Sequence, residues 1–206
     1  MTNKPDHPPS PQPLILVLGA SGKTGRRVAD KLESRNFPVR RGSRAGTPAF
    51  DWNHESGWDV CLHNVDAVYL TYVPDLAIPG ATDSIQSFVN HAKTSGVRRI
   101  VLLSGRGEKE AQACEKIVQA SGLEWTIVRA SWFNQNFSEG AFLELVLNGR
   151  ITLPAGDVRE PFVDVDDIAD VAVAALTTTS PRHLGQVYEV TGPELLTFAE
   201  VAQKIS

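Results

Sequence analysis

The apolar residues of the chain follow two alternating patterns. Continuous apolar runs, of which Leu14 to Leu18 is the first, are typical of strands buried on both faces of a parallel sheet. Between such runs apolar residues recur at helical spacing, as Val28, Ala29 and Leu32 do after the first run. Strands that alternate with helices in this way predict right-handed crossovers and a doubly wound, parallel α/β sheet of the Rossmann type.

The same reading gives the remaining elements. Further strands are expected in the extended segment after Pro38 and at residues 49–52, 66–73, 98–104, 124–130 and 185–192. Helices are expected at residues 23–34, 55–63, 82–95, 108–120 and 139–147, within 165–176, and from residue 197 onward. Thr197 with Glu200 three residues later is a capping-box pattern, which predicts the start of the last helix.

Length and composition predict one domain. The 206 residues suffice for one α/β domain, which we expect at 14–206 after a disordered proline-rich tail at 1–13. Residues 132–164 and 185–206 are expected to form a small C-terminal lobe, and the oligomeric state stays open.

The net charge of -4 argues against a nucleic-acid partner, and no segment has the pattern of a signal peptide or a membrane span. Cys61 and Cys114 lack metal-site spacing and are interpreted as reduced core thiols of a cytoplasmic protein.

A glycine-rich turn follows the first strand directly. Gly19, Gly22 and Gly25 form the pattern GxxGxxG between that strand and the first helix. Such glycines allow a tight turn, close approach of backbone N–H groups to a pyrophosphate, and close packing of helix on strand. Ser21, Lys23 and Thr24 add further donors. The turn predicts a dinucleotide site at the positive end of the helix dipole, with a purely structural turn as the alternative.

The segment after the second strand indicates which dinucleotide is preferred. An acidic residue there favours NAD, whereas arginine favours the additional phosphate of NADP. The segment reads VRRGSR and has no carboxylate before Asp51, so NADP(H) is expected rather than NAD(H), with Ser43 and Arg44 as the phosphate contacts. Asp51 and Trp52 are candidates for the adenine, although a structural role for Trp52 is an equal alternative. Thr71, Tyr72 and Ser104, at the ends of later strands, complete the expected cofactor site.

The aspartates near residue 165 resemble a metal site at first sight. Asp164, Asp166, Asp167 and Asp170 lie at the start of a predicted helix, where the dipole and capping favour carboxylates. We therefore expect no metal.

Seven stretches then point to a family: GASGKTG, FDW, VDAVYL, GVRRIVLLS, SGLEWTIVRASWFNQNFSE, PFVDVDDIADVA and GPELLTFAEVA. In their order and spacing the chain resembles the NmrA-like atypical short-chain dehydrogenases. That group includes triphenylmethane reductase, NADPH-dependent quinone reductases and fungal ergot-alkaloid reductases. The resemblance covers nearly everything from Leu14 onward.

The chain departs from the wider superfamily at one point. Orthodox members carry a Tyr-x-x-x-Lys pair on the helix after the strand at 98–104, and the corresponding positions here are Gly107 and Ala111. Of the catalytic groups only Ser104 remains, and serine is a weak proton donor at neutral pH. The resemblance therefore does not imply the usual alcohol dehydrogenase mechanism.

Two functions stay open. The favoured one is an NADPH-dependent reductase of a flat, conjugated small molecule of the quinone or iminium type, which needs little acid catalysis. Trp132, Phe133, Asn134 and Asn136 would then bind the substrate, with core packing of the two aromatic residues as the alternative. The other function is a non-catalytic NADP(H) sensor of the NmrA type that acts through a regulatory protein partner.

Overall fold

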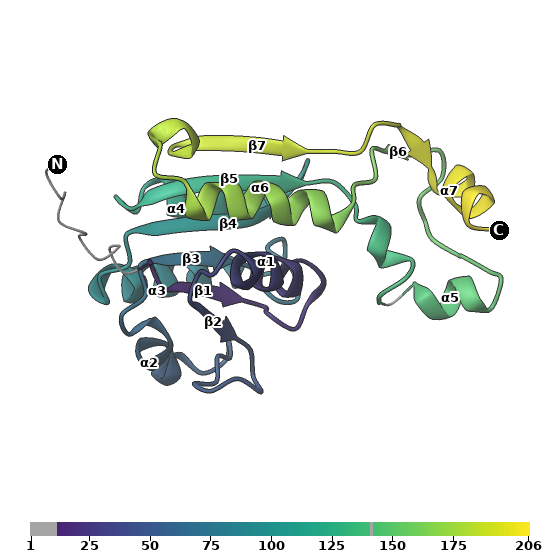
Figure 1. The fold of residues 1–206 in the computed structure, drawn as a ribbon. Coiled ribbons are helices and arrows are strands. Elements are labelled where there is room, and N and C mark those ends of the chain that lie inside the picture. The colour runs from purple at the N-terminus through teal and green to yellow at the C-terminus, as the bar shows by residue number, and fades with distance from the viewer. Residues whose placement is uncertain (1–11, 141) are drawn as a thin grey trace, which may run out of the picture.

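A six-stranded parallel sheet forms the centre of the molecule (Figure 1), and the computed structural model describes residues 12–140 and 142–206. The strands are β1 (Ile15–Leu18), β2 (Val39–Gly42), β3 (Ala67–Leu70), β4 (Arg99–Gly105), β5 (Glu124–Ala130) and β7 (Gln186–Val190), in the order β2-β1-β3-β4-β5-β7. This confirms the predicted doubly wound α/β fold. The predicted tail at 1–13 lies almost wholly outside the described residues.

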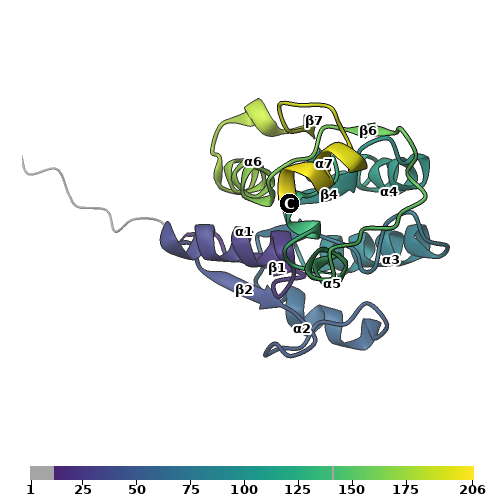
Figure 2. The same cartoon turned by 90° about the vertical axis from the view of Figure 1, so that its right-hand side faces the viewer.

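Helices cover both faces of the sheet, as Figure 2 shows along the strands. Helices α1 (Lys23–Ser34) and α6 (Val165–Thr177) cover one face, where Val28, Leu32 and Ile168 belong to one buried cluster. The other face carries α2 (Trp58–Leu62), α3 (Ala81–Thr94) and α4 (Lys109–Gln119) over a second cluster. Short 3-10 turns lie at Glu55–Gly57, Asn134–Asn136 and Pro181–His183.

A small lobe lies beyond the carboxyl ends of the strands (Figure 1). It contains α5 (Leu143–Leu147), the antiparallel pair β6 (Arg159–Glu160) and β8 (Leu196–Thr197), and α7 (Phe198–Ile205). Phe137, Phe162 and Val201 are buried at its centre. Residues 186–190, expected in this lobe, instead form β7 and pair with β5 in the main sheet.

The segment at 49–52 is not a strand, against the prediction. Phe50 and Trp52 pack edge to face with ring centroids 5.2 Å apart, and both pack on Trp58. Asp51 turns the chain, because its carboxylate accepts the Asn53 N–H at 2.9 Å. Aromatic packing and a turn, rather than sheet pairing, therefore hold the segment. The helix predicted at 139–147 is also shorter, since of the described residues in that range Leu143–Leu147 are α-helical.

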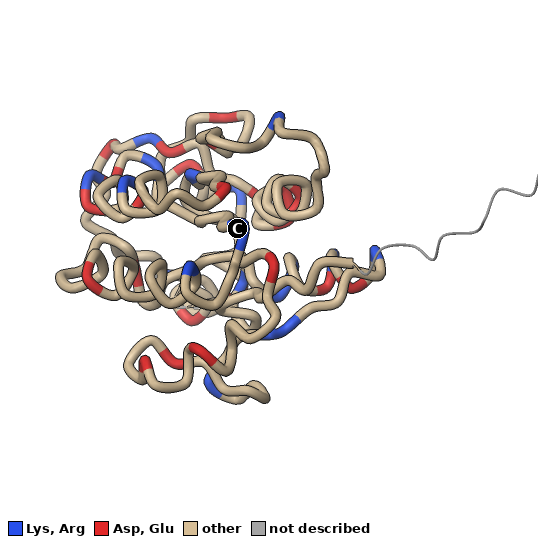
Figure 3. Tube along the Cα trace, turned by 90° about the vertical axis from the view of Figure 1, so that its left-hand side faces the viewer, with Lys and Arg blue, Asp and Glu red and all other residues tan. Residues whose placement is uncertain are grey.

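Two predicted helix starts are confirmed. The Thr197 side chain accepts the Glu200 N–H and the Glu200 side chain accepts the Thr197 N–H, which is the expected capping box. Asp164 caps α6 by accepting the Asp166 N–H. Charges of both signs are interspersed along the chain (Figure 3), and no helix in the described part is long and apolar enough to cross a membrane.

Candidate functional site

A cleft of about 520 Å³ opens at the carboxyl ends of the central strands. The chain continues from β1 to β2 on one side and returns to β3 on the other side of β1, so this edge holds the switch point of the sheet, where α/β proteins bind ligands. Ten predicted site residues line the cleft: Gly19, Gly22, Lys23, Thr24, Thr71, Tyr72, Ser104, Trp132, Phe133 and Asn136. Seven others do not: Ser21, Gly25, Ser43, Arg44, Asp51, Trp52 and Asn134.

The glycines of the turn meet different steric demands. Gly19 has φ +63°, a conformation that side chains disfavour. A Cβ on Gly25 would collide with the Gly19 carbonyl and lie 2.9 Å from the Leu18 oxygen, so Gly25 lets α1 pack closely on β1. Gly22 is different, because a Cβ there would meet only the Gly19 oxygen, at 3.2 Å. Its missing side chain leaves room on the cleft side of the turn.

The start of α1 has the features of an anion site. Its N-cap residue, Gly22, provides no side-chain cap, and its first turn contains no acidic residue. The first N–H groups of a helix need an acceptor, and the helix dipole favours a negative one. Gly22, Lys23 and Thr24 all line the cleft at this point. The residues therefore fit the pyrophosphate of a dinucleotide.

The three arginines after the second strand have distinct surroundings. Arg40 donates to the carbonyls of Cys61 and His63 at 2.8 and 2.7 Å. Arg41 pairs with Asp30 and Glu33. Arg44 is exposed and makes no ion pair within residues 12–140 and 142–206. Its guanidinium is therefore available to an anionic ligand.

Ser43 and Arg44 follow β2 beside the glycine turn. The Ala20 N–H donates to the Gly42 carbonyl at 3.2 Å, which ties the turn to the end of β2. Trp52, by contrast, packs on Trp58 and Tyr72. These contacts give Trp52 a structural role.

Ser104 at the end of β4 belongs to a buried ionic network. Its hydroxyl donates to a Glu115 carboxylate oxygen at 2.6 Å, and Arg129 donates to both oxygens of Glu115 at 2.8 and 2.6 Å. Glu115 is 1% exposed. The Ser104 proton is thus directed at a carboxylate, although the residue lines the cleft. This arrangement weakens Ser104 further as a proton donor.

Ser131, which follows β5, presents an unused hydroxyl. Its Oγ is buried and has no hydrogen-bond partner among residues 12–140 and 142–206, and the residue lines the cleft. Buried polar atoms normally have partners, so an orphan in a cleft wall indicates a group that a ligand satisfies.

Aromatic rings form the lobe side of the cleft. Trp132 is 40% exposed, stacks on Phe142 with the rings nearly parallel at 5.9 Å, and meets Phe198 edge to face. It therefore both packs in the lobe and lines the cleft. Phe133 packs partly against the core beneath, and the Asn134 N–H donates to the Val163 carbonyl.

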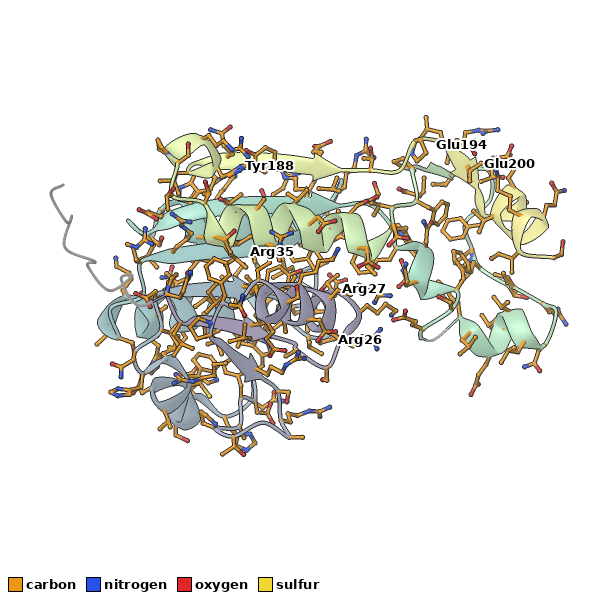
Figure 4. All side chains as sticks on the ribbon, viewed as in Figure 1. Arg26, Arg27, Arg35, Tyr188, Glu194 and Glu200 are labelled. Atoms are coloured by element: carbon orange, nitrogen blue, oxygen red, sulfur yellow. The ribbon has the colours of Figure 1, made fainter. Side chains whose placement is uncertain are left out.

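An ionic contact joins the glycine-turn helix to the lobe. Arg27 donates to the two Glu139 oxygens at 2.7 and 3.2 Å, and Arg26 donates to one of them at 2.9 Å. Figure 4 shows Arg26 and Arg27 at the lobe end of α1. The Arg27 guanidinium holds the pKa of Glu139 below its usual range. Helix α1, whose start has the features of an anion site, is therefore fixed to the segment that follows Trp132.

The positions assigned to the orthodox catalytic pair have no proton-transfer groups. Gly107 lies in the turn after β4 with φ +81°, and Ala111 is fully buried in α4. No tyrosine of the chain is followed by lysine four residues later, since Val73, Leu76 and Gly192 occupy those positions.

Sequence reasoning missed two carboxylates in the cleft wall. Asp75, in the loop after β3, and Glu108, directly before α4, both line the cleft. Glu108 could have been found from the sequence, because it directly follows Gly107, the position at which orthodox members carry the tyrosine.

Comparisons with known proteins agree with this geometry. No family model matches the chain. Agroclavine dehydrogenase of Claviceps fusiformis is 34% identical over 212 residues, covering 92% of this chain and 71% of that protein. NAD(P)H azoreductase of Xenophilus azovorans is 31% identical over 214 residues, covering 94% and 73%. The structure of Citrobacter sp. triphenylmethane reductase complexed with NADP(H) superposes with a TM-score of 0.71 at 18% identity, covering 93% of this chain and 74% of that one. The chain belongs to the NmrA-like branch of the atypical short-chain dehydrogenase/reductase family.

Proposed function

We propose that the chain is an NADPH-dependent reductase of flat, conjugated acceptors of the quinone or iminium type. The observation that carries the proposal is one cleft that joins an uncapped glycine turn to the aromatic wall at Trp132. The names of its relatives, a clavine dehydrogenase and an azoreductase, support reduction of conjugated nitrogen compounds.

The proposed cofactor site uses three groups of residues. Lys23 and Thr24 bind the pyrophosphate through their backbone N–H groups and the lysine charge, and Gly22, whose own N–H donates to the Gly19 carbonyl, leaves room for it. Ser43 and Arg44 bind the ribose phosphate, and this contact selects NADP(H) over NAD(H). When bound, NADPH supplies a hydride to the acceptor.

The proposed acceptor side suits substrates that need little acid catalysis. Gly107 and Ala111 bring no proton donor, and the Ser104 hydroxyl is hydrogen-bonded to Glu115. A quinone spreads the incoming negative charge, and an iminium ion loses its positive charge on reduction, so positioning supplies much of the effect. Trp132, Phe133 and Asn136 hold the flat acceptor, and Ser104 and Ser131 offer hydroxyl oxygens to it or to the nicotinamide.

An oxidation assay tests the proposal. We expect the chain to consume NADPH with a quinone, an imine or a triphenylmethane dye, and Ser104→Ala to cost less than roughly tenfold in kcat, because serine is a weak acid. Failure of every acceptor despite tight NADPH binding would contradict the reductase. If, in addition, a protein partner bound the oxidised and reduced cofactor complexes with different affinities, the non-catalytic NADP(H) sensor would be favoured.

A further inference from the structure

Glu108 occupies an unusual place in the cleft. It is the residue directly before α4, next to Gly107, and its carboxylate does not cap the helix. The carboxylate lies instead over the end of β4, where a Cβ built on Gly105 would stand 2.8 Å from Oε1 and collide with Oε2. This is the edge of the sheet to which Ser104 and Ser131 also contribute.

The Glu108 carboxylate has no ion-pair partner among the described residues. Of the basic cleft residues, Arg106 pairs with Glu189 at 3.3 Å and Lys23 lies beside Gly140. The charged groups that act on Glu108 are acidic: Asp75 from the loop after β3 and Glu110 from α4.

These surroundings favour the protonated carboxyl. Burial raises the pKa of Glu108, and the charges of Asp75 and Glu110 raise it further. Burial removes water from the carboxylate, and like charges oppose its ionisation. A half-buried carboxyl of this kind holds a proton closer to neutral pH than an exposed glutamate does.

We propose that Glu108 is the proton donor of the reduction. It replaces the tyrosine that orthodox members of the superfamily carry at the position of Gly107; the inference rests on the proposed reductase function. Two independent observations support it: the position of the carboxylate over Gly105, and the partnerless Ser131 hydroxyl in the same cleft, which indicates a ligand there.

A quinone acceptor gains a hydride, that is two electrons and one proton, from the reduced nicotinamide and becomes the hydroquinone anion. Glu108 gives its carboxyl proton to that oxyanion, and the products are hydroquinone, NADP⁺ and the Glu108 carboxylate. Glu108 is only partly buried, so it takes its proton back from solvent.

Carboxyl titration of the protein without cofactor tests the proton-holding role apart from activity. In carbon-13 NMR of protein labelled at the glutamate carboxyls, one resonance should titrate above the ordinary glutamate range and be absent from Glu108→Gln. Asp75→Asn should lower its pKa, because a negative neighbour is removed. A Glu108 carboxyl that titrates in the range of an ordinary exposed glutamate would overturn the proposal.

Activity on two acceptors then tests the proton transfer. With a neutral quinone, Glu108→Gln should lower kcat by roughly tenfold with little change in KM, which is below the 10²–10⁴-fold usual for a general acid because a quinone spreads much of the incoming charge itself. Quinone reduction by the wild-type protein should also decline as pH rises through the Glu108 pKa. With a cationic triphenylmethane dye, which hydride alone neutralises, kcat should stay within roughly twofold because no proton is needed.

Glu144→Gln is the matched control, since it removes the same charge from an exposed glutamate outside the cleft wall. It should leave quinone kcat within roughly twofold. Equal quinone activities of the two variants would refute the proton donor while leaving the reductase intact. If Glu108→Gln raised KM for the dye and left the quinone reaction unchanged, the proton-donor role would also be overturned. Glu108 would then bind cationic acceptors. If the wild-type protein reduced neither the quinone nor the dye, the result would instead count against the proposed function.

Discussion

At the scale of single residues, neighbours of the same type perform different tasks. The sequence VRRGSR contains Arg40, Arg41 and Arg44, of which Arg44, with Ser43, was predicted as the phosphate contact. In the fold, Arg40 binds backbone carbonyls and Arg41 binds two carboxylates of α1. Arg44 is exposed beside the turn and remains free of ion pairs among the described residues.

Arg44→Ala should weaken NADPH binding by about 1.5–3 kcal/mol, the contribution typical of a hydrogen bond to a charged group. NADH lacks the phosphate, so its affinity should not change. Isothermal titration calorimetry with both cofactors measures the difference.

Arg41→Ala serves as the control, because Arg41 is bonded to Asp30 and Glu33. The ratio of NADPH to NADH affinity should stay that of the wild-type protein. Should Arg44→Ala weaken both cofactors alike, the arginine would have only a structural role.

At the scale of elements, the junction of β1 and α1 shows why the glycine pattern has its spacing. The third glycine, Gly25, faces the carbonyls of Leu18 and Gly19 so closely that backbone must move to admit a methyl group. The second, Gly22, has room on the cleft side.

Gly25→Ala should therefore destabilise the fold by about 1–3 kcal/mol, the cost usual for overpacking a tightly packed site. Gly22→Ala should cost clearly less, because only one oxygen at 3.2 Å has to give. Urea unfolding of both variants tests this difference. Equal losses of unfolding free energy would show that the close packing at Gly25 is relieved by local adjustment.

Local patterns predicted elements where propensity and packing agree. The buried run at β1, the capping box at Thr197 and the aspartate cap of α6 were all recognisable from the sequence. The segment at 49–52 was not, because its aromatic residues favour a strand by propensity but pack on Trp58 and turn at Asp51 instead. Tertiary packing decided between two locally acceptable structures.

At the scale of the whole molecule, the cleft exists because the ends of separate strands converge. Residues after β1, β3, β4 and β5 line it together, and the fold class predicted that edge. The partners of the cleft residues were not predictable, since no local signal links Ser104 with Glu115 or Glu115 with Arg129. The position of Glu108 over Gly105 likewise depends on the turn at Gly107.

The central claim is that the glycine turn binds NADP(H), and calorimetric titration of NADPH into the wild-type protein and Gly22→Val tests it most directly. We expect the wild type to bind NADPH at least roughly tenfold more tightly than NADH, a difference of about 1.4 kcal/mol. Gly22→Val should keep the wild-type circular dichroism spectrum and lose measurable NADPH binding, because the branched side chain fills the space of the pyrophosphate. A folded Gly22→Val protein that binds NADPH as tightly as the wild type would contradict the claim.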